Sequence, residues 1–178
     1  MAKFETHLSL SSLDEMIKRY EKRKKDYPKL ATNIANRLAN EMLEDVKQAT
    51  SPHGRKPYED TELIPVTLEG HIAISGIINT TDKAYFNEFG TGIVGSQNPH
   101  ITEELAKEGY KYDVNSHGEA GWWYPTTEDD PNPTKKEANN GWIAWTKGLP
   151  AQKAFYEALK KAEERFTEVG KEELEKEV

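Results

Sequence analysis

Five apolar side chains recur at every fourth position early in this 178-residue chain, and this repeat constrains the fold more than any other feature. They are Leu30, Ile34, Leu38, Met42 and Val46. Because an α-helix completes a turn in about 3.6 residues, the five form one narrow stripe along a helix about 30 Å long. Small alanines beside the stripe let a sheet or a second helix approach closely. Pro28 suits the first turn of this helix.

A separate, shorter helix is predicted before Pro28. Ser12 and Glu15 have the spacing of a capping box, and Leu13, Ile17 and Tyr20 follow at helical intervals. The basic stretch from Lys18 to Lys25 is interpreted as a solvated helix face. Residues 1–27 are therefore expected to form an N-terminal helix or arm.

A β-hairpin is predicted after the long helix, which the Ser51-Pro52-His53-Gly54 segment terminates. Residues 63–68 and 72–78 are rich in β-branched and apolar side chains, and Glu69-Gly70 can form the tight turn between them. Ile72, Ile74 and Ile78 lie on one face of the second strand. That face is expected to pack on the long helix.

The stretch from Asn79 to Lys147 is weakly periodic, and we expect it to be largely irregular. Only a short helix at 102–108 and a short strand at 142–146 are predicted within it. A last helix is expected to open at Pro150, with Phe155, Ala158, Leu159, Ala162, Phe166 and Val169 at helical spacing. The whole chain, 1–178, is predicted to be one domain, with a core over 28–170, an insertion at about 93–141 and a charged tail over 171–178 that frays.

Charge and composition exclude several classes of function. The formal net charge of -7 opposes a dedicated role in binding nucleic acid, which depends on Lys and Arg contacts to phosphate. The chain has no cysteine, so disulfides and thiolate metal sites are absent. No secretory signal and no bilayer-spanning apolar run are found, so the protein is expected to be soluble and made in the cytoplasm.

Gly90-Thr91-Gly92-Ile93-Val94-Gly95 matches the glycine pattern of dinucleotide-binding loops. That pattern needs a buried strand before it and a long helix after it. The residues from Tyr85 to Phe89 mix aromatic and polar side chains, and Pro99 prevents a long helix. We therefore predict that the glycines serve a turn and that no cofactor binds there.

No constellation in the sequence points to a reaction or to a metal ion. The five histidines lack helical metal-site spacing. His117 and Glu119, with Asp113 nearby, are explained by a turn, and the acidic run 128–133 by a solvated surface loop. A hydrolase based on His117 and Glu119 would lack a nucleophile or a metal set. The chain is therefore predicted to be neither an enzyme nor a metalloprotein.

Aromatic side chains are dense in the predicted irregular region. They are Tyr85, Phe86, Phe89, Tyr110, Tyr112, Trp122, Trp123, Tyr124, Trp142 and Trp145. Large rigid rings on irregular segments favour protein interfaces, because they supply contact area at a low cost in conformational entropy.

The block Tyr-Phe-x-Glu-Phe-Gly-Thr-Gly at 85–92 resembles a block of the tail completion proteins of long-tailed bacteriophages. Other features are similar in order: the long first helix, the Ser51-Pro52 linker, Thr61-Glu62-Leu63 before the hairpin, and Gly148-Leu149-Pro150-Ala151 with Phe155 before the last helix. The segment 112–125 is similar to an insertion in members from phages of low-GC Gram-positive bacteria. Glu62, Ile64 and Pro65 depart from the family pattern, which leaves the entry into the first strand open.

The resemblance implies an α+β structural virion protein that works in the phage neck and has no enzymatic activity. It implies a ring of six copies between the head completion protein and the tail terminator or tube proteins, through which DNA passes without specific binding, and no membrane partner. The interface residues expected on this basis are Tyr85, Phe86, Glu88, Phe89, Gly90, Thr91, Gly92, Trp122, Trp123 and Tyr124. Phe89 is expected to anchor the contact, and the glycines to adopt backbone angles that other residues disfavour.

A second hypothesis from a different class stays open. The same aromatic loops would also suit a cytoplasmic regulator, encoded by a phage or a plasmid, that binds a host protein. Assembly state separates the two, because a ring or binding to a tube end favours the tail protein and a monomer with a host partner favours the regulator.

Overall fold

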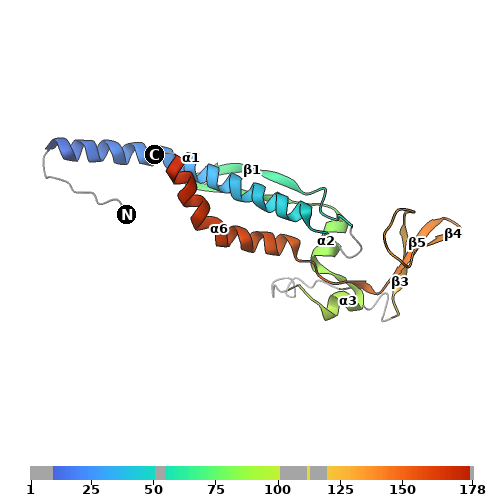
Figure 1. Cartoon of the computed structure of the whole chain (residues 1–178). Helices are drawn as coiled ribbons and strands as arrows, with labels where there is room; N and C mark the ends of the chain where they lie inside the picture. Colours follow the sequence, from blue (N-terminus) through green and yellow to red (C-terminus); the bar gives the residue numbers. More distant parts are fainter. Residues whose placement is uncertain (1–9, 51–54, 101–111, 113–119, 177–178) are drawn as a thin grey trace.

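The computed structural model describes residues 10–50, 55–100, 112 and 120–176. The molecule is elongated, with the long helix α1 between a hairpin on one side and the C-terminal helix α6 on the other (Figure 1). A small second sheet lies at the end opposite to the N-terminal part of α1 (Figure 1). The α+β class predicted from the sequence is confirmed.

Helix α1 runs without interruption from Leu10 to Gln48, so the prediction of two helices was wrong. Pro28 lies inside the helix instead of opening it, and Ser12 lies inside the first turn instead of capping it. Proline removes one backbone donor and crowds one carbonyl, but the apolar stripe continues in phase on both sides of it. The Thr32 hydroxyl donates a hydrogen bond of 2.8 Å to the Pro28 carbonyl.

The predicted hairpin is confirmed, with β1 at Glu62–Glu69 and β2 at Ile72–Ile78 paired antiparallel, but the turn is Gly70-His71 and not Glu69-Gly70, because Glu69 pairs with Ile72. A bulge between Ile64 and Thr67 accommodates Pro65, which cannot donate to a strand ladder. The predicted orientation was wrong: the face that carries Ile72, Ile74 and Ile78 is exposed.

The opposite face of the hairpin packs on α1, and Ile77 contacts the main apolar cluster. Both faces of β2 carry apolar side chains, so the period of the pattern could not distinguish them. The main cluster contains the buried residues Val46, Tyr58, Ala84 and Ala158, with Met42, Ala49, Ile77, Ala154 and Phe155 packed against it.

Helix α6 extends from Ala154 to Lys176 and packs along α1. It begins four residues after Pro150, because the intervening backbone is held by other segments: the N–H groups of Gln152 and Lys153 donate to the carbonyls of Asn87 and Glu88. The predicted fraying beyond Gly170 was wrong as far as Lys176. Of the predicted stripe, Ala158 and Val169 are buried, whereas Leu159 and Phe166 are exposed.

Two contacts with α1 fix the last turns of α6. Arg37 forms ion pairs of 2.6 Å with Glu172 and 3.1 Å with Glu173. The hydrogen bonds from Lys176 and Arg37 lower the pKa of Glu173, so its carboxylate is charged at neutral pH.

The region between the hairpin and α6 is more regular than the sequence indicated. Its described residues form the helices α2 at Asp82–Phe89 and α3 at Gly92–Gln97 and four strands. Strands β3 at Trp122–Thr126, β4 at Lys136–Ala138 and β5 at Gly141–Thr146 form an antiparallel sheet in the order β3-β5-β4. This sheet, called the small sheet below, includes the predicted strand at 142–146. Strand β6 is Gly148–Leu149, and the predicted helix at 102–108 lies outside the described residues.

Candidate functional site

The motif that carries the family resemblance lies on α2 and on the turn that follows it. The Thr81 hydroxyl caps α2 by accepting a hydrogen bond of 3.3 Å from the Ala84 N–H. At the other end, the Gly90 N–H donates to the Phe86 carbonyl at 2.9 Å. A capped two-turn helix therefore presents residues 85–89 in a fixed orientation.

Gly90 and Gly92 have positive φ angles of 80° and 61°, which confirms the predicted reason for glycine at these positions. Both also lie against backbone. A Cβ atom on Gly90 would lie 2.7 Å from the Leu149 carbonyl oxygen, and one on Gly92 would lie 2.5 Å from that of Lys147. The close approach of these two segments permits no side chain at either glycine.

Two antiparallel bridges join this turn to β6, Thr91 with Leu149 and Gly92 with Gly148. The Thr91 hydroxyl also accepts a hydrogen bond of 3.2 Å from the Leu149 N–H. The two sequence blocks that carry the resemblance, 85–92 and 148–151, are thus in direct contact. We call this place, where the turn 90–92, β6 and the start of α6 meet, the junction.

Glu88 lies at the centre of the junction and is 6% exposed. Its carboxylate accepts hydrogen bonds of 3.1 Å from the N–H groups of Phe155 and Tyr156, in the first turn of α6. Nε2 of His100 lies 3.3 Å from one carboxylate oxygen, and the Tyr58 hydroxyl 3.5 Å from the other. The first N–H groups of a helix have no partner within it and carry partial positive charge, so Glu88 caps α6 from a distant segment.

Tyr58 is fully buried under this carboxylate. Burial raises the pKa of Tyr58, and the negative charge of Glu88 and the hydrogen bond to it raise it further. The phenol therefore stays protonated and acts as a donor toward Glu88. The ring of Phe155 packs edge-on against Tyr58, with centroids 5.9 Å apart, which closes the apolar side of the junction.

A cleft of about 640 Å³ separates α2 from the small sheet. Lys83, Phe86 and Asn87 line it from α2, and Trp122, Tyr124 and Trp145 from the sheet. Asn87 is 7% exposed, and its Oδ1 atom has no hydrogen-bond partner, while its Nδ2 atom donates to the Lys83 carbonyl. The cleft thus offers aromatic surface and one unused buried acceptor, which is the chemistry of a site that binds another molecule's side chain.

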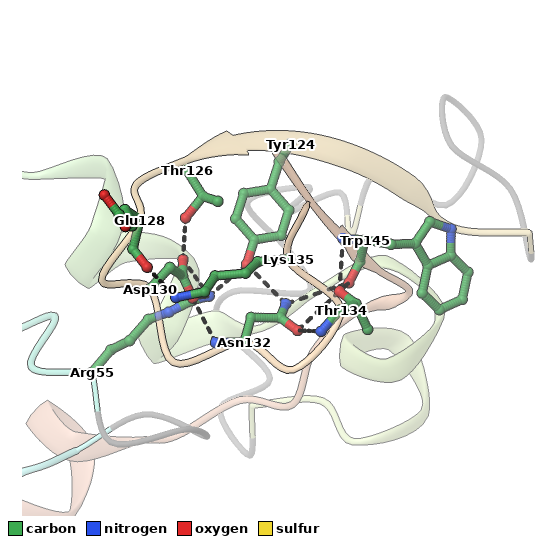
Figure 2. Close-up of polar contacts among 9 residues, drawn as sticks. All are labelled: Arg55, Tyr124, Thr126, Glu128, Asp130, Asn132, Thr134, Lys135 and Trp145. Carbon is green, nitrogen blue, oxygen red and sulfur yellow. Dashed lines mark hydrogen bonds and ion pairs between the residues drawn. The ribbon is translucent and has the colours of Figure 1, made fainter. Parts of the chain in front are cut away.

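The small sheet is held to the rest of the chain by a network around Asp130, shown in Figure 2. Arg55 contacts both carboxylate oxygens of Asp130, at 2.6 and 2.8 Å, and donates to the Tyr124 hydroxyl at 2.5 Å. The Asn132 N–H at 2.7 Å and the Thr126 hydroxyl also donate to Asp130. Burial acts to raise the pKa of Asp130, but the hydrogen bonds from Thr126, Asn132 and Arg55 outweigh it and lower the pKa.

The expectation of a solvated loop at 128–133 was therefore only partly right. Glu128 and Asp129 are exposed, but the Asp130 side chain is 8% exposed and Asn132 is buried. The Asn132 side-chain amide donates a hydrogen bond of 3.0 Å to the Tyr124 hydroxyl, and this bond connects the loop to β3. The loop is a structural element of the small sheet.

The structure separates the ten predicted interface residues into three groups. Tyr85, Phe86 and Trp123 are exposed, and Trp122 and Tyr124 line the cleft. The motif residues Glu88, Gly90 and Gly92 are buried inside the chain, and Thr91 is partly buried in the contact with β6. Phe89 is partly buried, with its ring 4.9 Å from that of Tyr85 and 5.3 Å from that of His100.

Arg55, Asn87 and His100 were not singled out from the sequence. No local pattern marks Arg55 or His100, because their partners lie 75 and 12 residues away. Asn87 could have been noticed as one of the two polar residues, with Glu88, inside the aromatic block Tyr85–Phe89. His117, Glu119 and Asp113 lie outside the described residues.

The glycine pattern at 90–95 does not have the setting of a dinucleotide site. Helix α2, and not a strand, precedes it, and α3 ends after six residues. Across the described parts of the chain, no three His, Asp or Glu side chains are grouped to hold a metal ion. Among the same described residues, none of the helices has the length and apolarity that a membrane span requires.

Comparisons of the chain with protein-family models, with curated proteins and with solved structures gave no match. The resemblance to tail completion proteins therefore rests on the motif residues and on their order in the sequence.

Proposed function

We propose that this chain is a tail completion protein of a long-tailed bacteriophage, one subunit of a ring in the neck that joins head to tail. The observation that carries the proposal is the junction. One of its blocks, Glu88–Gly92, is the most specific part of the resemblance, and it contacts the second block, Gly148–Ala151, although the insertion at about 93–141 separates the two. A chance match of short motifs gives no reason for this contact.

The distribution of apolar surface agrees with a role in assembly. Exposed aromatic rings occur at Tyr85, Phe86 and Trp123, of which Phe86 lines the aromatic cleft, and exposed isoleucines lie on the hairpin. A neighbour in a ring would cover such surface on every copy, since cyclic assemblies repeat one contact. A junction held by backbone contacts, together with exposed aromatic side chains, suits a subunit that binds the head completion protein on one side and tail proteins on the other.

The charge of the chain agrees with the passage of DNA. At a net charge of -7 the chain as a whole repels phosphate, which opposes adhesion of DNA during ejection. In this proposal the ring holds its place through protein contacts, without a cofactor and without catalysis.

A stop codon in the gene tests the proposal. A phage that carries it should produce filled heads and separate tails that fail to join, visible by electron microscopy of the lysate. A plasmid copy of the wild-type gene is the control and should restore joined particles. Complete infectious particles in normal yield without the protein would contradict the proposal, and would favour a regulator that binds a host protein.

The structure also improves the choice of interface variants. Phe89→Ala would remove ring contacts inside the chain as well as any contact with a neighbour, because Phe89 packs on Tyr85 and His100. Trp123 is 47% exposed, with Nζ of Lys136 4.0 Å from the centroid of its ring, so Trp123→Ala removes more exposed surface than Phe89→Ala does. We expect Trp123→Ala to fold normally and to reduce the yield of joined particles, with Leu159→Ala, exposed on α6 at 49%, as the matched variant of an exposed apolar residue outside the predicted interface.

A further inference from the structure

The N-terminal part of α1, residues 10–27, extends beyond the ends of α6 and the hairpin (Figure 1). We call it the rod. Its large apolar side chains are exposed, from 39% for Leu13 to 75% for Tyr20, with Met16, Ile17 and Tyr27 between these values. An isolated helix of this length is marginal in water, so a rod with an apolar stripe is stabilised when another surface covers it.

The stripe of the rod continues the stripe that is packed elsewhere in α1. At about 100° per residue, Leu13, Ile17 and Tyr20 lie in line with Ala31 and Leu38, which are partly buried. Only Lys24 interrupts the line, and a lysine stem can lie flat across apolar surface. The rod therefore has the surface of a helix that packs on a sheet or on another helix.

The outer face of the hairpin is a matching uncovered surface. It carries Ile64, Ile72, Ile74 and Ile78, which are 42–66% exposed. By the strand register, Glu69 lies beside Ile72 and Glu62 beside Ile78 on the same face. A two-stranded hairpin is marginal alone, and this one is covered by α1 on one face only.

The two surfaces agree in length and in charge. The rod is about 27 Å long and β1 about 26 Å. Residues 10–27 contain six Lys and Arg against four Asp and Glu, with the six concentrated between Lys18 and Lys25. Residues 59–78 contain four Asp and Glu and no Lys or Arg. The rod is thus a basic helix with an apolar stripe, and the outer hairpin face is an apolar surface with an acidic residue at each end, so the two are complementary.

Other positions for the rod are less favourable. The outer side of α6 also has exposed apolar residues, Leu159 and Phe166, but α6 mixes five Lys and Arg with seven Asp and Glu, whereas the charged residues of 59–78 are all acidic and attract a basic rod more strongly. Two rods packed on each other would bring two basic stretches together, at a cost in like-charge repulsion.

We propose that the rod of one copy lies on the outer hairpin face of the next copy, so that the hairpin is sandwiched between its own α1 and a neighbour's. The contact is head-to-tail, because the two surfaces are different patches of the same chain. Such a contact repeats around a closed ring. The inference rests on the ring of the proposed function and specifies which surfaces form it.

Engineered cysteines test the contact in the full-length chain, which has none of its own. One protein carries Ile17→Cys in the rod and another Ile74→Cys in the hairpin. They are mixed with a short bis-maleimide cross-linker. A third protein with Lys160→Cys, exposed on α6, replaces the hairpin variant in the control mixture. Circular dichroism of each variant checks that it is folded.

We expect the Ile17→Cys and Ile74→Cys proteins to form a mixed dimer in roughly tenfold excess over the control mixture. A chain with both substitutions should form a ladder of cross-linked oligomers. A yield no greater than that of the control, or a predominance of rod-to-rod dimers, would overturn the proposal. Either result leaves the stop-codon phenotype unaffected, so the contact and the neck function can fail independently.

Discussion

The junction and the small sheet are each organised by a buried carboxylate, but the two carboxylates are held differently. Glu88 accepts two backbone N–H groups of α6 that lie 67 and 68 residues away in sequence. Asp130 accepts from Thr126 at the end of β3 and from Asn132 in its own loop, and it is paired with one distant cation, Arg55.

This difference indicates how damage spreads. Loss of Glu88 leaves buried helix N–H groups without partners and loosens α6, which forms one side of the main body. Loss of Asp130 loosens a local loop and the contact with Arg55. All four tryptophans lie on the small sheet, at 122, 123, 142 and 145, so tryptophan fluorescence reports that sheet while far-UV circular dichroism reports mainly α1 and α6.

The largest effect is expected for Glu88→Gln. The amide keeps the shape but has one acceptor oxygen, so one α6 N–H loses its partner and the charge at the helix end is lost. We expect the free energy of unfolding to fall by about 3 kcal/mol, with urea-induced transitions followed by both signals shifted together. Glu157→Gln, exposed in the first turn of the same helix, is the control and should cost about 0.5 kcal/mol. Equal effects of the two variants would show that Glu88 is not the cap of α6.

Gly92→Ala should have an effect of similar size. Gly92 and Gly70 have nearly equal φ angles, 61° and 63°, but a Cβ on Gly70 meets nothing within 4 Å. Gly70→Ala therefore measures backbone strain alone, about 1 kcal/mol, and Gly92→Ala adds the clash with the Lys147 carbonyl, for a total of about 3 kcal/mol. Thermal unfolding compares them. If the two variants are equally stable, the turn 90–92 and β6 do not approach as closely as described.

Asp130→Asn should have a smaller effect confined to the small sheet, about 1–2 kcal/mol, because Arg55 loses its anionic partner. The contribution of the Asp130 carboxylate to stability should also depend on pH. The pKa of Asp130 is lower in the folded chain, so its stabilisation is complete above the unfolded value of about 3.9 and is lost as pH falls through the folded value. Tryptophan fluorescence should therefore change in acid before the helical signal does, and this early change should be absent in Asp130→Asn. Coincident acid transitions in the wild type would contradict the local role of Asp130.

The smallest effect is expected for Lys161→Met. Lys161 pairs with Asp45 at 3.0 Å between α6 and α1, but both side chains are well exposed. Solvent screening limits such a pair to within about 0.5 kcal/mol. A loss comparable to that of Glu88→Gln would mean that surface ion pairs, and not the junction, hold α6 on α1.

The sequence predicted those elements whose signals are local. The four-residue apolar repeat identified the packed half of α1, and the β-branched runs around Glu69-Gly70 identified the hairpin. The strand at 142–146 was also predicted from its own residues. The positive φ angles of Gly90 and Gly92 follow from glycine itself.

The remaining features depend on partners that are distant in sequence. The outward orientation of Ile72, Ile74 and Ile78 follows from which face α1 covers, and no period in the sequence records that. The extension of α6 to Lys176 depends on Arg37 from α1. Glu88 was predicted as an interface residue. Its role as the cap of α6 could not be predicted from the motif, because the first N–H group that donates to it lies 67 residues away.

In-vitro complementation tests the central claim most directly. Purified wild-type protein is added to a lysate of the stop-codon phage, and plaque-forming particles are counted. The proposal predicts that the protein converts separate heads and tails into infectious particles, and that a matched sample with Glu88→Gln, heated above its unfolding transition, does not. No gain in infectivity on adding folded wild-type protein, with filled heads and intact tails present in the lysate, would contradict a role in joining head to tail.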